Sequence, residues 1–234
     1  MAKLSSLRSF VVVGFLLSLA LHTPRAYAAD AWRAQVTQAA LATYVHGMTE
    51  QIAADEFGPD AIPVLLELLD DPDFPRRDNV IAVLAFLGGD EAVGALRGLL
   101  RSPPRAPQDA VEDRALLLVP QALGQIAGRG NAGALRTLLR STRDGGNGGV
   151  LGVTADNAAN PSSYRDDLLE SAIRGLAYAG GDASRRRLAK LSKGRVRPAH
   201  DGRDLRAQAA FALQLVDEIG GVAPGGTSAS GGGA

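Results

Sequence analysis

The chain contains no cysteine and only three histidines among its 234 residues. Without cysteine it can form no disulfide, and it has no thiolate to act as a nucleophile or a metal ligand. His46 and His200 lie far apart without neighbouring ligand residues, which is too little for a zinc site or a histidine-based triad. We therefore expect no enzyme activity, no metal and no cofactor. The fold must rest on an apolar core, which a hydrophobic content of 46% permits.

An excess of charge of either sign is also lacking, since 25 basic residues balance 25 acidic ones. Three of the basic residues, Lys3, Arg8 and Arg25, fall in a segment that we expect to be removed. The remainder would carry 22 basic against 25 acidic residues, a net charge of −3. Such a balance gives no overall attraction to nucleic acid, and we expect no nucleic-acid partner.

Only one long apolar run occurs, FVVVGFLLSLAL from Phe10 to Leu21. Basic residues precede it, and Ala26-Tyr27-Ala28 follows as a small-x-small cleavage site. The run is shorter than the roughly 20 apolar residues that a membrane span needs. Residues 1–28 therefore read as a signal peptide, which predicts a periplasmic or secreted protein without stable membrane insertion after cleavage.

At the other end, residues 222–234 consist almost entirely of glycine, serine, alanine and threonine and carry no charged side chain. Such a segment buries too little apolar surface to offset the entropy lost on ordering. We predict a disordered tail.

The most regular feature of the sequence is a pattern of glycine and leucine positions, which we call the frame and which recurs four times. Each copy begins at a glycine that is followed, seven residues later, by a leucine, and another leucine lies five residues before the next frame glycine. The glycines are Gly58, Gly89, Gly128 and Gly181; the leucines are Leu65, Leu96, Leu135 and Leu188, then Leu84, Leu123, Leu176 and Leu215. A fixed frame of this kind indicates stacked supersecondary units that cannot bury their apolar faces alone.

Within each unit, the segments on both sides of the glycine are apolar at helical spacing, as in Leu65, Leu68 and Leu69. The unit is therefore a first helix, a connection, a second helix and a tight glycine turn, with the glycine in the left-handed conformation. The second helices begin near Asp78, Asp113, Asp166–Asp167 and Asp204, and Pro120 should kink its helix or delay its start. We predict an all-α fold, an α-solenoid of antiparallel helix pairs, with capping helices over 29–57 and about four units over 58–221.

The motifs resemble a known family. Gly89 to Leu100 reads Gly-Asp-Glu-Ala-Val-x-Ala-Leu-x-x-Leu-Leu, and Asp70-Asp71-Pro72-Asp73 follows the first helix. Both are similar to short HEAT repeats of the PBS-lyase-like type, over about 58–221. The resemblance implies a protein-interaction platform. The resemblance also suggests an accessory role, similar to that of a lyase, in chromophore attachment. Export of the chain argues against that role.

With Gly220 closing the last unit, the spacing between successive frame glycines is 31, 39, 53 and 39 residues, and all the excess lies between the two helices of a unit. In an antiparallel stack these insertions share one edge, which in solenoids is often the binding side. The longest runs from Asp144 to Ser163 and is either a binding loop or a tolerated surface excursion. Its candidate binding residues are Asp144, Asn147, Asp156 and Asn157, whose spacing fits no EF-hand.

Charge is unevenly distributed along the chain. Eight acids and no basic residue lie between Glu50 and Asp73, whereas nine basic residues and two acids lie between Arg185 and Arg206. The two clusters are either ordinary solvated surfaces, or a docking site, or opposite ends that pair head to tail between copies. The candidate partner- or anion-binding residues are Arg185, Arg186, Arg187, Lys190, Lys193, Arg195 and Arg197.

One motif imitates a cofactor site. Gly128 to Gly133 fits G-x-G-x-x-G and precedes a helix, but a dinucleotide site also needs a strand before it. Since a helix is expected there, we interpret the motif as a repeat turn. The sequence as a whole predicts an exported, non-enzymatic scaffold for protein–protein interaction, with binding of an anionic envelope polymer through the basic C-terminal end as the alternative.

Overall fold

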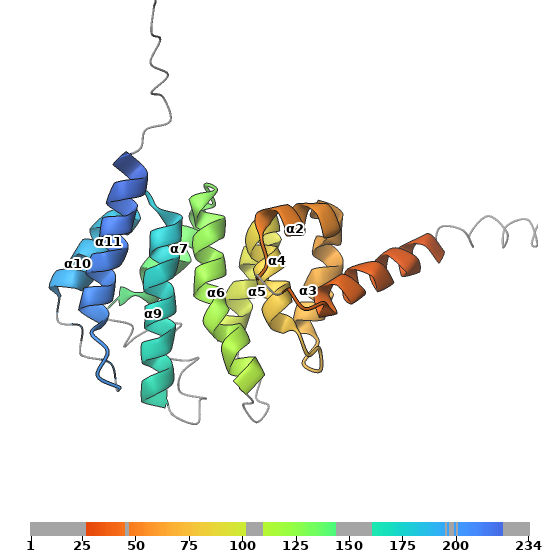
Figure 1. Ribbon diagram of the computed structural model, residues 1–234, viewed down its shortest axis with the longest axis horizontal. Helices are drawn as coiled ribbons and strands as arrows, with labels where there is room; N and C mark the ends of the chain where they lie inside the picture. Colours follow the sequence, from red (N-terminus) through yellow and green to blue (C-terminus); the bar gives the residue numbers. More distant parts are fainter. Residues whose placement is uncertain are drawn as a thin grey trace, which may run out of the picture.

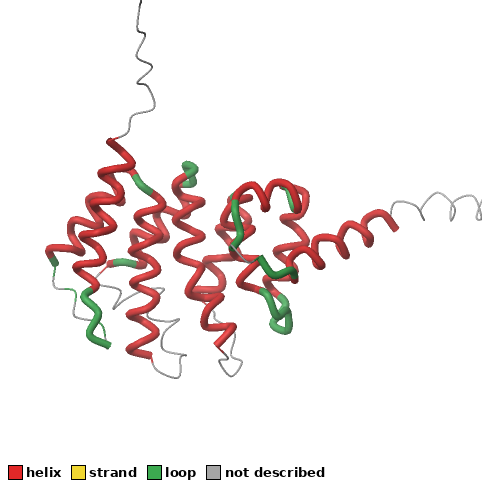
Figure 2. Tube along the Cα trace, viewed as in Figure 1, coloured by secondary structure: helices red, strands yellow, loops and turns green. Residues whose placement is uncertain are grey.

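The computed structural model describes residues 27–44, 47–101, 110–143, 161–194, 196, 199 and 201–221. Within these ranges every regular element is a helix and no strand occurs, which confirms the all-α class (Figure 2). Most of the expected signal peptide, the expected tail, and the candidate residues Asp144, Asn147, Asp156, Asn157, Arg195 and Arg197 lie outside the described residues.

Two short helical segments precede the repeat frame. A helix over 27–41 buries Val36 and Ala40 completely. Helix α2 (Glu50–Glu56) begins after Thr49, whose hydroxyl accepts the N–H of Ile52 at 3.2 Å. The side chain of Asn79 donates to the carbonyls of Ala40 and Ala42, at 2.9 Å each, and so fixes the end of the first helix against α4 (Arg77–Leu87).

The remaining helices form two layers. Layer A, as we call it, contains α3 (Ile62–Asp70), α5 (Asp90–Arg101), α7 (Ala132–Ser141) and α10 (Gly181–Lys193). Layer B contains α4 (Arg77–Leu87), α6 (Ala110–Gly128), α9 (Pro161–Ala179) and α11 (Leu205–Gly221). Each helix contacts its neighbours within its own layer and a helix of the other layer, so the chain advances steadily in one direction (Figure 1).

The frame leucines lie between these layers. Six of them are completely buried: Leu65, Leu84, Leu96, Leu123, Leu176 and Leu188. Burial of each such side chain contributes about 1.5–3 kcal/mol relative to an exposed position. In α7 the fully buried apolar residues are Ala134 and Leu138, whereas the frame residue Leu135 is only partly covered, so this helix does not bury the frame position that α3, α5 and α10 bury.

The glycine turns lie along one edge of the stack, and the Asp71–Arg76 connection and the starts of α6, α9 and α11 lie along the opposite edge (Figure 1). Gly58, Gly89 and Gly181 have φ of 66°, 106° and 69°, as expected for left-handed turn glycines. Gly128 does not follow this expectation, because it is not a left-handed turn glycine. It is the last residue of α6, and Gly130, with φ of 96°, takes the left-handed position.

The structure corrects two further expectations about the second helices in part. Of the two effects expected of Pro120, a kink or a delayed start, the delayed start does not occur, because α6 runs through Pro120 from Ala110. Helix α9 starts at Pro161, so Asp166 is buried more than a turn inside it and cannot serve the helix start. Asp204 does lie at a start, because its carboxylate accepts the N–H groups of Arg206 and Ala207 at the beginning of α11. These backbone hydrogen bonds lower the pKa of Asp204.

Helices α6 and α9 approach each other to backbone contact. A β-carbon at Gly124 would lie 2.2 Å from the carbonyl oxygen of Gly175, and one at Gly128 would lie 2.6 Å from that of Tyr178. A β-carbon at Gly175 would in turn lie 2.3 Å from the carbonyl oxygen of Pro120. Because three glycines permit this approach, the second and third units form the tightest part of the stack.

Candidate functional site

The basic residues of α10 divide into a structural and an exposed group. The guanidinium of Arg185 lies 2.6 Å from the carboxylate of Asp217 and 3.3 Å from that of Asp182, and so ties α10 to α11. Arg186, Lys190 and Lys193 are exposed, and none of the three has an ion pair within the described ranges. Arg187, also expected to bind a partner, is partly buried, and Arg195 and Arg197 lie outside the described residues, so the exposed group within the described chain is formed by Arg186, Lys190 and Lys193.

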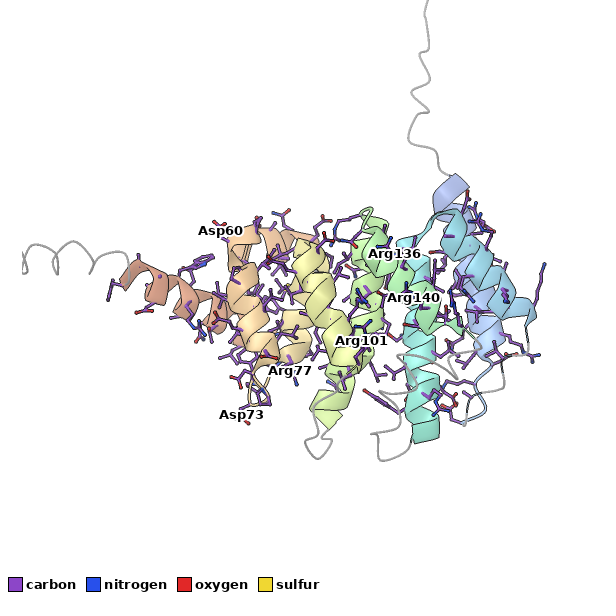
Figure 3. The ribbon with its side chains drawn as sticks, turned by 180° about the vertical axis from the view of Figure 1, so that it is seen from behind. Asp60, Asp73, Arg77, Arg101, Arg136 and Arg140 are labelled. Carbon is purple, nitrogen blue, oxygen red and sulfur yellow. The ribbon has the colours of Figure 1, made fainter. Side chains whose placement is uncertain are left out.

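Neighbouring helices of layer A extend the charge. Arg97 and Arg136 lie eight residues after their frame glycines, and Arg101 and Arg140 lie twelve residues after them, at the frame position of Lys193. Figure 3 shows Arg101, Arg136 and Arg140 on one side of the molecule. We call the basic face the set Arg97, Arg101, Arg136, Arg140, Arg186, Lys190 and Lys193.

Acids are nearly excluded from the helices of the basic face. Helix α7 has none, and those of α5 and α10 lie in the first turn, beside the glycine edge. The four arginines of α5 and α7 were not predicted as binding residues, because they do not form a dense cluster along the chain. Their constant offset from the frame glycines is the signal that would have identified them.

The opposite end of the same side is acidic. Asp60 lies in the short 3-10 helix η1 (Pro59–Ala61), Asp70 ends α3, and Asp73 follows it; all three are exposed. Figure 3 shows Asp60 and Asp73 well separated from Arg136 and Arg140. Between the two ends lies a shallow hollow of about 390 Å³ between α3 and α5, floored by Leu66, Leu69, Ala95 and Leu99 and flanked by Asp70 and Arg101.

Layer B carries an apolar groove that was not expected. It lies between α9 and α11, has a volume of about 480 Å³, and includes Ala177, Tyr178, Phe211 and Leu215 among its lining residues. Tyr178 is 54% exposed and Phe211 62% exposed, although both are large and apolar. A second hollow of about 460 Å³ shares Ala177, Tyr178 and Leu215 and extends toward the glycine turn before α10. We call the combined cleft the aromatic groove.

Carboxylates of α9 and of the segment before α11 are already paired with arginines. Arg203 donates to Asp167 and Glu170 of α9 and lies 2.6 Å from Asp201. Hydrogen bonds to these carboxylates, that to Asp167 first, raise the pKa of Arg203 further above its usual range. Glu170, whose side chain is 9% exposed, also pairs with Arg174. The cluster holds the segment before α11 against α9 and presents no free base or nucleophile.

The part of the chain that the structure describes contains neither a metal-binding cluster nor a membrane-spanning helix. No group of three or more His, Asp or Glu side chains is placed to hold a metal ion. No helix there combines the length and the apolarity that a membrane span requires. The G-x-G-x-x-G motif joins α6 to α7 and is preceded by a helix, and Asn131 within it caps α7 by accepting the N–H of Ala134 at 3.0 Å.

Comparison with protein-family models, with curated proteins and with solved structures finds no match for this chain.

Proposed function

We propose that this protein is an exported, non-enzymatic scaffold, an α-solenoid of short HEAT-like repeats, which holds a protein partner in the aromatic groove. The progressive stacking of layers A and B supports the solenoid, and the resemblance of its motifs supports the repeat type. Its interaction role rests above all on one observation: Tyr178 and Phe211 stand exposed on two adjacent helices, over a cleft of about 480 Å³.

The groove has the composition of an interaction hot spot. Aromatic residues that anchor partners lie in apolar pockets from which water is excluded on binding, and a few of them supply most of the binding energy. Alanines at 177, 207 and 212 leave room beside the rings, and Arg174 and Gln208 offer polar contacts at the margin. A helix or an extended segment with large apolar side chains fits such a cleft.

Site-specific photo-crosslinking in the native cell tests this proposal. A photoreactive residue at position 208 faces the groove, and one at position 214 is exposed on the same helix outside it, so the two glutamines form a matched pair. We expect one protein to be captured from position 208 and not from 214. Phe211→Ala or Tyr178→Ala should then weaken its binding by about tenfold or more without loss of fold. Equal capture at both positions, or binding insensitive to both variants, contradicts the proposal.

A second candidate function is favoured by Arg186, Lys190 and Lys193, exposed cations on one helix without ion pairs in the described structure. We propose that they bind an anionic envelope polymer. The affinity for such a polymer falls steeply with salt because bound cations are released.

Polyphosphate serves as the probe for this second function. Replacing the three residues by alanine should abolish binding, whereas Arg186→Lys, Lys190→Arg and Lys193→Arg together should preserve it, since they keep the charge. The logarithm of the affinity is plotted against the logarithm of the salt concentration for both proteins. If the alanine variant binds with the same affinity and the same slope as the unchanged protein, polymer binding by α10 is refuted.

A further inference from the structure

The exposed cations of α7 and α10 have the same register relative to the core. In α10, three cations each follow a buried residue by two positions: Arg186, Lys190 and Lys193 follow Ser184, Leu188 and Leu191. In α7 the same offset separates two exposed arginines from two buried residues, Arg136 and Arg140 from Ala134 and Leu138. Two residues turn a helix by about 200°, so both sets point away from the core. Because α7 and α10 are in contact within layer A, the two sets lie on neighbouring helices of one layer.

Helix α5 adds a third position to this side. Arg101, its last residue, is exposed and lies on the same side of the molecule as Arg136 and Arg140 (Figure 3). Gly94 and Gly98 of α5 have open space where a β-carbon would lie, so these positions do not obstruct a ligand that passes over the helix. Neighbouring helices are about 8–10 Å apart, so the cations of α5, α7 and α10 extend over about 20 Å.

Helix stability alone does not explain this grouping of charge. Cations in the last turn of a helix interact favourably with its dipole, and this effect is available to every helix. Basic residues occupy the last turn of α5, α7 and α10, whereas α3 and the four helices of layer B have none there. Six exposed cations of the basic face have no ion pair with another described residue: Arg101, Arg136, Arg140, Arg186, Lys190 and Lys193.

The residue types on these helices favour one kind of anionic polymer. Helices α5, α7 and α10 contain no Phe, Tyr or Trp, so they offer no ring on which the bases of a single-stranded nucleic acid could stack. Arginine predominates among the six cations, and its planar guanidinium binds two phosphate oxygens at once. A phosphate polymer carries its anionic oxygens on the backbone itself. A carboxylate polymer must in addition order the side arms that carry its charges, which costs entropy.

We infer that the basic face binds a linear phosphate polymer without bases, which crosses α10, α7 and α5 in turn. This inference rests on the polymer binding by α10 proposed above and adds α7 and α5 to that site. The three cations of α10 are the densest group and anchor the polymer, while Arg101, Arg136 and Arg140 extend the contact. The polymer ends its course at α5, because Asp70 and Asp73 at the far end of α3 repel it.

The length of the polymer then governs its affinity. A triphosphate is too short to reach from α10 to α5 and contacts α10 alone. A long-chain polyphosphate contacts all three helices, and each contact after the first is made within the same complex. Linked contacts of this kind raise the affinity by about 10²–10⁴-fold over a single one.

Isothermal titration calorimetry on the full chain, with triphosphate and long-chain polyphosphate as probes, tests this inference. The face variant combines Arg101→Gln, Arg136→Gln and Arg140→Gln. We expect it to bind polyphosphate about tenfold or more weakly and to bind triphosphate as the unchanged protein does. Between about 0.05 and 0.2 M salt, the slope of log affinity for polyphosphate against log salt should change from about −4 to about −2, at about −0.7 per contacted phosphate of a single chain.

A matched control variant removes as many charges elsewhere. Arg33→Gln, Arg114→Gln and Arg206→Gln replace three exposed arginines that lie outside the basic face, in the helix over 27–41, in α6 and in α11. This variant has the same net charge as the face variant and should bind polyphosphate with the affinity and the salt slope of the unchanged protein. An equal loss in both variants would mean that only net charge matters, and would overturn the inference.

The remaining outcomes separate this inference from the function on which it rests. If the face variant binds polyphosphate normally while the alanine variant of α10 does not, the three-helix site is wrong and polymer binding by α10 stands. If the alanine variant of α10 also binds normally, both are wrong. Polyglutamate or oligothymidylate that binds as tightly as polyphosphate would overturn the assignment to a phosphate polymer without bases.

Discussion

Gly175→Ala is expected to lower the free energy of unfolding by about 3 kcal/mol, because the added methyl group has no space. It would lie 2.3 Å from the carbonyl oxygen of Pro120 and 3.0 Å from its carbonyl carbon, both backbone atoms of α6. Neither atom can move unless the whole helix moves. Urea unfolding followed by circular dichroism measures the effect as a shift of the midpoint at constant slope.

Gly98→Ala is the matched control for this prediction. It makes the same chemical change in the middle of a layer A helix, but nothing lies within 4 Å of the new methyl group. Alanine is favoured over glycine inside a helix, so this variant should gain about 0.5–1 kcal/mol. Similar stabilities for the two variants would mean that α6 and α9 are not in backbone contact.

The helices were predictable because a helix with one buried face needs apolar residues at helical spacing, and this spacing is visible in the sequence. Leucines at fixed distances from a glycine located α3, α4, α5 and the other paired helices, and six of the eight frame leucines are indeed completely buried. The prediction was wrong about the position of one turn glycine. Gly128 was taken for a turn glycine, but Gly130 supplies the turn two residues later. A glycine that serves helix contact and one that serves a turn are identical in a sequence.

The candidate sites were predictable only where they are local in the sequence. The cations of α10 stand together along the chain and were found, although Arg185 proved to be occupied by Asp217. The aromatic groove is lined by Tyr178 and Phe211, which come from different helices. The sequence pattern of either helix alone does not predict that the two rings line the same cleft. Likewise the acidic residues Asp60 and Asp73 and the basic residues Arg136 and Arg140 come from different units, and their common side emerges only when the units are stacked.

The second large effect on the free energy of unfolding is expected from replacement of Arg77. Its side chain is buried, with only 5% of the residue exposed, and its Nε and Nη2 atoms donate to the carbonyl oxygen of Leu69 at 3.1 and 2.8 Å. Leu69 lies in the last turn of α3, where carbonyl groups have no partner within the helix. Arg77 thus closes the end of α3 from the first turn of α4 (Figure 3).

Arg77→Met keeps most of the apolar volume but removes both donors, and leaves a buried carbonyl group without them. We expect a loss of about 2–4 kcal/mol in the free energy of unfolding, measured by the same urea titration. Arg101→Met is the control, since Arg101 is exposed and has no ion pair within the described structure, and it should change stability by about 0.5 kcal/mol or less. If both variants cost equally little, the end of α3 is satisfied by water, and the connection to α4 is held by its apolar contacts alone.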